Sequence, residues 1–134
     1  MKLIYAQKTK YLVFTLGAII SIYLTWVHYQ PSVLACPQTG VINCSRVLHS
    51  PGSQIFGVPL ALLGGLWLLA ALIAKYKGQV YLLVVSGALG LIWAWGHEYI
   101  VHTICLWCTG MQLTVVYALV ILVYRQLNVK SEVA

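Results

Sequence analysis

The chain has 134 residues, of which 61% are hydrophobic and 7% are charged, against about 25% charged residues in ordinary soluble domains. This composition excludes a soluble globular core as the main structure. The formal net charge of +6 does not indicate nucleic-acid binding, because the basic residues are scattered at the ends of apolar segments and are not gathered on one polar face.

Uncharged apolar windows dominate the sequence, and each is long enough for a helix that crosses a hydrocarbon core of about 30 Å. They take up more than half of the chain, so we expect one membrane domain over residues 1–134 and no separate soluble domain. The predicted fold is all-α, a four-helix transmembrane bundle with a long loop between helices 1 and 2. The four windows are Tyr11 to Tyr29, Ile55 to Ala74, Gln79 to Gly96 and Thr103 to Tyr124.

The distribution of basic residues predicts how the bundle lies in a membrane. With four spans, seven of the eight basic residues share one side, and Arg46 alone falls on the other. The positive-inside rule therefore places both termini and the central turn in the cytoplasm, and the other two loops outside. The seven residues are Lys2, Lys8, Lys10, Lys75, Lys77, Arg125 and Lys130.

The first window also has the basic start of a signal peptide. We expect an uncleaved helix instead, because the run is long, lacks a small-residue cleavage site and ends in the interfacial aromatics Trp26 and Tyr29. After it, Asn43 precedes Cys44, Val47 and Leu48, a pattern that predicts a short amphipathic helix at the membrane surface.

The later elements follow from the remaining windows. The second helix is expected to begin near Ser53, with Gly57 and Pro59 in its first turns. Residues 76–78 would form a minimal turn to the third helix. The fourth helix is expected to begin at about Thr103 or Cys105.

All four cysteines fall on the predicted extracytoplasmic side, where disulfides persist. Cys36 and Cys44 lie in the long loop, and Cys105 and Cys108 lie at the outer start of the fourth helix. Purely structural disulfides are the alternative. A CxxC pair separated by one helical turn, at a helix N-terminus that favours thiolate, is instead typical of redox-active cysteines.

Four cysteines allow three pairings, and a relay needs more than one of them. One route begins with attack of a reduced protein on a Cys36–Cys44 bond, after which a freed loop thiolate reaches a Cys105–Cys108 bond. The electrons then need an acceptor. No flavin or haem motif is present, so a lipid-soluble quinone is the simplest acceptor, and Cys108, one turn deeper than Cys105, is its natural donor.

The order of these motifs resembles that of the vitamin K epoxide reductase family over nearly the whole chain. The resemblance rests on the spacing of Cys36 and Cys44, the serine at position 50, the Ile55-Phe56-Gly57 sequence, and the later Cys105-Leu106-Trp107-Cys108. Oxidases of the DsbB type share the chemistry but place CxxC in the first outer loop.

The resemblance implies a four-helix bundle around a quinone of the ubiquinone, menaquinone or vitamin K type. Cys108 would react with the quinone and Cys105 would receive electrons from Cys44. Cys36 would form the mixed disulfide with a thioredoxin-fold (DsbA-like) partner, and Ser50 would support the site. Many bacterial relatives carry a fused thioredoxin-like domain. The 134 residues contain no such domain, so we expect this partner to be a separate protein.

Further candidates for quinone contact are Ser53, Phe56, Trp107 and Gln112. In the vertebrate enzymes, an amide that contacts the quinone aligns with Ser53, and the tyrosine four residues after the last cysteine aligns with Gln112. These two differences from the vertebrate enzymes favour quinone reduction over epoxide reduction. Gln112 remains able to donate a hydrogen bond to a quinone oxygen, Trp107 is able to stack on its ring, and Phe56 belongs to the family's motif.

The remaining polar residues give weaker signals. Four histidines, His28, His49, His97 and His102, lie near the outer face, but they do not form a zinc-binding pattern with the cysteines, and we expect no metal. His97 and His102 are candidate proton donors to a reduced quinone. Glu98 is interpreted as a solvated helix end.

Two functions therefore compete. The first is a membrane thiol-disulfide oxidoreductase that accepts electrons from an extracytoplasmic thioredoxin-fold protein and reduces a quinone, which supports disulfide-bond formation. The second is a small structural or transport subunit with two structural disulfides.

Overall fold

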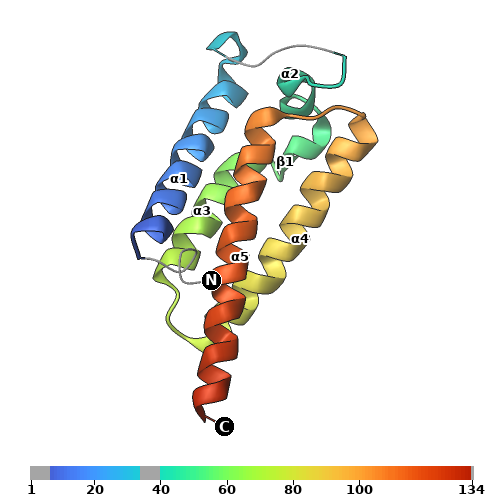
Figure 1. Cartoon of the computed structure of the whole chain (residues 1–134). Coiled ribbons are helices and arrows are strands. Elements are labelled where there is room, and N and C mark those ends of the chain that lie inside the picture. The colour runs from blue at the N-terminus through green and yellow to red at the C-terminus, as the bar shows by residue number, and fades with distance from the viewer. Residues whose placement is uncertain (1–6, 34–39, 134) are drawn as a thin grey trace.

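The computed structural model describes residues 7–33 and 40–133 of the chain. As expected, the fold is almost entirely helical (Figure 1), with one short β-hairpin. Turns of 3-10 helix lie at Pro31–Val33 and Pro51–Ser53. The α-helices are α1 (Gln7–Tyr29), α2 (Cys44–Leu48), α3 (Leu60–Ile73), α4 (Lys77–Val101) and α5 (Leu106–Val133).

Three of the helices are long and apolar enough to cross a membrane, by length and composition. They are the segments Lys8–Tyr29, Lys77–Val101 and Leu106–Asn128. The remaining long helix, α3, has 14 residues and a length of about 21 Å at 1.5 Å per residue, which is less than the hydrocarbon core. The structure thus has three candidate spans and one shorter apolar helix.

The second apolar window differs from the predicted helix at its start. Gln54–Ile55 and Val58–Pro59 form the two-stranded antiparallel sheet β1-β2. Both residues of the connecting turn have positive φ, 53° at Phe56 and 78° at Gly57, as a tight hairpin turn requires. Pro59, which has no N–H to donate, caps α3. The prediction of a helix from near Ser53 was therefore wrong by about two turns.

The turn between α3 and α4 also lies earlier than expected. It comprises residues 74–76, and α4 already begins at Lys77. The side chain of Gln79 holds it, because Oε1 accepts hydrogen bonds from the backbone N–H groups of Lys75 (3.2 Å) and Tyr76 (3.3 Å).

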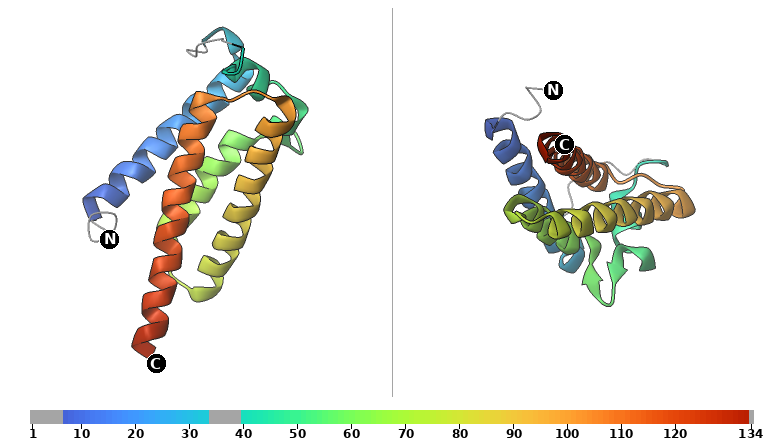
Figure 2. Two further views of the ribbon diagram at one scale, coloured as in Figure 1. Left: turned by 45° about the vertical axis from the view of Figure 1, so that its right-hand side comes forward. Right: turned by 90° about the horizontal axis from the view of Figure 1, so that it is seen from below.

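The helices form a bundle in which α5 lies between α1 and α4, and α3 packs on α1 and α5 (Figures 1 and 2). Large aliphatic side chains fill the interior, among them Leu24, Leu68 and Leu122. Others, such as Ile22 and Leu82, cover the outside. Helices that are apolar all round fit a lipid environment, in which their backbone groups are satisfied internally.

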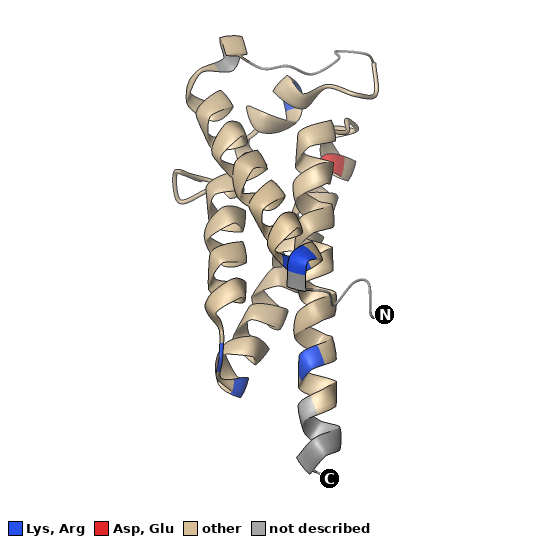
Figure 3. Ribbon diagram, turned by 60° about the vertical axis from the view of Figure 1, so that its left-hand side comes forward, with Lys and Arg blue, Asp and Glu red and all other residues tan. Residues whose placement is uncertain are grey.

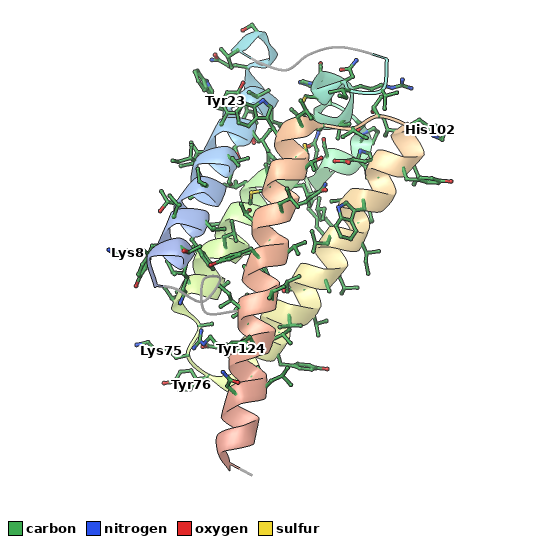
Figure 4. All side chains as sticks on the ribbon, viewed as in Figure 1. Lys8, Tyr23, Lys75, Tyr76, His102 and Tyr124 are labelled. Atoms are coloured by element: carbon green, nitrogen blue, oxygen red, sulfur yellow. The ribbon has the colours of Figure 1, made fainter. Side chains whose placement is uncertain are left out.

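The two ends of the bundle differ in charge (Figure 3). Lys8 and Lys75 lie toward the end where α3 turns into α4, while Tyr23 and His102 lie at the opposite end (Figure 4). α2, the hairpin and the start of α5 gather at that opposite end. We call it the mouth of the bundle.

A close approach of α1 and α3 depends on Gly65. The Ser21 hydroxyl of α1 donates a hydrogen bond to the carbonyl oxygen of Ala61, one turn before Gly65 (2.7 Å). A Cβ atom at Gly65 would fall on that hydroxyl, whereas one at Gly96 of α4 meets nothing within 4 Å.

Substitution Gly65→Ala should therefore lower the free energy of unfolding by about 1 to 3 kcal/mol, the usual effect of overpacking. Gly96→Ala is the matched control, and it should be neutral or stabilising by up to about 1 kcal/mol through helix propensity. Thermal unfolding in detergent measures both. Equal midpoints for the two variants would contradict this packing.

Candidate redox site

Two irregular segments meet at the mouth through a backbone bridge. Ile42 pairs with Ile104 in a parallel β-bridge. The Ile104 N–H donates to the carbonyl oxygen of Val41 (2.8 Å), and the Asn43 N–H donates to that of Ile104 (3.1 Å). Paired strands lie about 4.8 Å apart, so the bridge holds the chain before Cys44 beside the chain before Cys105. Both cysteine side chains are completely buried.

The predicted surface helix is present as α2 and begins at Cys44. Asn43 caps it, because its Oδ1 accepts the Arg46 N–H (3.0 Å), the usual role of asparagine at this position. The side chains of Cys44, Val47 and Leu48 are buried as predicted. Cys44 is disulfide-bonded. The predicted site residue Cys36 lies outside the described residues.

The CxxC pair consists of two free thiols at the start of α5. Cys105 precedes the first helical residue, its carbonyl oxygen accepts the Thr109 N–H (2.9 Å), and its Sγ accepts the Cys108 N–H (3.2 Å). Its sulfur thus occupies the position of an N-cap oxygen.

The pKa of the Cys105 thiol is lowered. The main cause is the hydrogen bond from the Cys108 side chain, and backbone N–H groups of Cys108 and Trp107 add to it. Burial and the negative charge of Glu98 oppose the shift. Thiolate therefore forms more readily at Cys105 than at an ordinary cysteine, and thiolate is the form that attacks a disulfide.

Replacing Cys108 by alanine should raise the pKa of Cys105, because the largest favourable contact with its thiolate is lost. A lowered pKa means that thiolate forms at lower pH, so the alkylation rate of Cys105 should rise with pH earlier in the reduced wild type than in Cys108→Ala. Iodoacetamide modification at a series of pH values, located by mass spectrometry, measures the two midpoints. A midpoint unchanged by the substitution would refute this origin of the shift.

A cavity of about 330 Å³ lies between α3, α4 and α5, below the mouth. Its walls are mostly apolar, with Leu60, Trp67 and Val115 among them. Cys108 lines it and Cys105 does not, which agrees with the expectation that Cys108 is the deeper cysteine. An apolar cavity with a few polar side chains is the usual form of a small-molecule site. Its polar side chains are Ser53, Ser86, His28, His97, Glu98 and Gln112.

The structure brings only two of the four further candidates to this cavity. Ser53 and Gln112 line it. Phe56 does not, because it sits at the tip of the hairpin with its side chain fully exposed. Trp107 is not a lining residue either, and its ring packs on that of Tyr23 with centroids 4.9 Å apart. The hydroxyl of Ser53 bonds the carbonyl oxygens of Leu48 (2.7 Å) and Ser50 (2.8 Å).

Ser50, the predicted supporting residue, links the loop to α4. Its Oγ donates to the carbonyl oxygen of Val47 (2.6 Å) and is hydrogen-bonded to Nε2 of His97. The neighbouring Gly52 accepts a hydrogen bond from the Trp93 indole N–H (3.0 Å). These contacts fix the segment between α2 and the hairpin against the end of α4. His102, the other histidine considered for proton transfer, is the C-cap of α4 and does not line the cavity.

Glu98 is a residue of the site that its sequence context did not predict. Its carboxyl is half-buried, lines the cavity and accepts a hydrogen bond from Gln112 Nε2 (3.0 Å). It is not the solvated helix end that we expected. Its presence in an apolar segment could have predicted a functional role, because an ionisable residue within a membrane segment is uncommon and usually functional.

Comparison with known proteins gives one match. The sequence profile of the vitamin K epoxide reductase family matches residues 11–123, which is most of the chain and includes all four cysteines. Neither the curated proteins nor the solved structures contain a match.

Proposed function

The chain belongs to the vitamin K epoxide reductase family, and from that membership and the site geometry we propose that it oxidises an extracytoplasmic thioredoxin-fold protein and reduces a membrane quinone. Membership indicates a membrane thiol-disulfide oxidoreductase. One observation carries the finer proposal: Cys105 is buried beside the segment of Cys44, while Cys108 of the same pair opens onto an apolar cavity.

The thiol steps balance as successive disulfide exchanges. The partner's dithiol reduces a Cys36–Cys44 disulfide and becomes oxidised. The Cys44 thiolate then attacks Cys105 of a Cys105–Cys108 disulfide, and Cys108 leaves as thiolate. Attack of Cys36 on Cys44 restores the loop disulfide and frees Cys105. After these steps the loop disulfide is restored and both thiols of the CxxC pair are free.

The cavity fits a quinone ring as the acceptor. Its volume of about 330 Å³ is at the lower end of the range for small-molecule sites, about 300 to 1,000 Å³. Apolar walls suit a lipid-soluble ring, the thiol of Cys108 supplies electrons, and the amide of Gln112 supplies a hydrogen-bond donor. A quinone of the ubiquinone, menaquinone or vitamin K type takes up two electrons and two protons in such a site.

The alternative of a structural subunit is less well supported. It gives no role to the apolar cavity that Cys108 lines. In that case neither pair would respond to mild reductant, since structural disulfides have low reduction potentials.

The charge at the two ends supports an orientation with the mouth outside and both termini in the cytoplasm. Lys8 and Lys75 lie toward the end opposite the mouth (Figure 4), and Arg125 reaches the carbonyl oxygen of Ala74 there, as the positive-inside rule expects of the cytoplasmic side. The cysteines then face the compartment in which disulfides persist.

Single cysteines at Gly40 and Gly78 test this orientation, since a Cβ atom meets nothing within 4 Å at either position. In a background with the four native cysteines changed to serine, Gly40→Cys should react in intact cells with a membrane-impermeant maleimide. Gly78→Cys should react only after permeabilisation. The opposite pattern would invert the topology.

The variant Cys108→Ser should lose quinone reduction with every donor, because the sulfur that faces the cavity is gone. Cys36→Ser is the matched control. It should lose activity with a reduced thioredoxin-fold protein but keep it with dithiothreitol, a small dithiol that reduces the CxxC pair directly. Quinone absorbance in proteoliposomes follows both reactions. Full activity of Cys108→Ser, or none in the wild type, would refute the proposed function.

A further inference from the structure

Quinone reduction by a dithiol moves protons as well as electrons, and this inference rests on the proposed function. As the Cys105–Cys108 disulfide forms, two S–H bonds break and two electrons leave. The quinone gains both electrons, and two O–H bonds form on its oxygens. A proton must therefore cross an apolar cavity, in which a positioned side chain transfers it more effectively than scattered water.

The amide of Gln112 is held in one orientation. Its Oε1 accepts the indole N–H of Trp95 (2.6 Å), and its Nε2 donates to Glu98 Oε1 (3.0 Å). Because an indole nitrogen only donates, the amide oxygen must face Trp95 and the amide nitrogen must face Glu98. One amide N–H of Gln112 remains for a further acceptor.

The same network places the Glu98 carboxyl near the reacting sulfur. Cys108 and Gln112 are four residues apart on α5 and so lie on the same face of the helix, and both line the cavity with Glu98. The charge of Glu98 acts on Cys105 as well. The hydrogen bond from Gln112 therefore holds the Glu98 carboxyl of α4 against the face of α5 that carries Cys108.

A structural ion pair does not account for the presence of Glu98. In the described part of the chain it contacts no lysine or arginine, and its one hydrogen-bonding side chain is Gln112. A carboxyl in an apolar membrane segment is costly without a partner. His97 also lines the cavity, but its Nε2 is already engaged by Ser50 of the loop.

We propose that Glu98 is the proton donor to the quinone, with Gln112 as the residue that positions its carboxyl. Glu98 gives its proton to one quinone oxygen and takes up the proton released by one cysteine thiol. The other thiol supplies the second proton. Glu98 therefore ends each turnover in the state in which it began, and the disulfide and hydroquinone account for all atoms and electrons.

The variant Glu98→Gln tests proton transfer separately from positioning. Its amide oxygen still accepts the hydrogen bond from Gln112, but it has no proton to release and take up. With a pre-reduced CxxC pair, the single-turnover rate of quinone reduction should fall by about 100-fold or more, as for loss of a general acid. Reduction of the CxxC pair by a thiol, which needs no quinone, should change far less than this, because Glu98 acts on Cys105 only through its charge.

Three further measurements complete the test. Glu98→Asp should recover part of the quinone rate, because it restores a carboxyl. Glu132→Gln, the same chemical change in the last turn of α5, should behave as the wild type. In protein with a reduced CxxC pair and no quinone, the infrared spectrum should contain a protonated-carboxyl band that Glu98→Gln removes.

The contrary outcomes are distinct. A wild-type rate in Glu98→Gln, together with a slow Glu98→Leu, would mean that the carboxyl only positions Gln112, and it would overturn the proposal. A carboxyl band that persists in Glu98→Gln would also overturn it. A wild type that reduces no quinone would refute the proposed function and this inference with it.

Discussion

The parallel bridge between Ile42 and Ile104 is the contact on which the arrangement of the site depends. Among the described residues, the hydrogen bonds of this bridge are the backbone hydrogen bonds that join the loop carrying Cys44 to the segment just before α5. Two backbone hydrogen bonds, of 2.8 Å and 3.1 Å, fix the register of these segments. Because this pairing fixes the backbone just before Cys44 and just before Cys105, both buried cysteines are held at the mouth.

The apolar character of the bundle separates the two reactions that the site is proposed to perform. Under the proposed function, thiol exchange takes place at the mouth, where Cys105 lies just before the first turn of α5 and has a lowered pKa. The proposed quinone reduction would take place one turn deeper, where Cys108 lines the cavity. One CxxC motif would then connect an aqueous protein substrate with a lipid-soluble one, and Glu98 and Gln112 supply polar groups at the deeper position.

The sequence predicted those features that depend on local pattern. Apolar windows located the long helices, Asn43 located α2, and the CxxC spacing distinguished Cys108 from Cys105. The hairpin was missed because Ile55 to Pro59 is as apolar as a helix start, and a positive φ at Phe56 has no sequence signal. Glu98 was missed because its role depends on a contact between α4 and α5 that no local pattern encodes.

Trapping the disulfide between Cys44 and Cys105 tests the relay most directly. In a Cys36→Ser and Cys108→Ser double variant, the account predicts that these two thiols pair rapidly under mild oxidation, which peptide mapping detects. The matched variant Cys36→Ser and Cys105→Ser, which leaves Cys44 and Cys108, should pair far more slowly. If Cys44 pairs with Cys108 as fast as with Cys105, or with neither, the relay through Cys105 is contradicted.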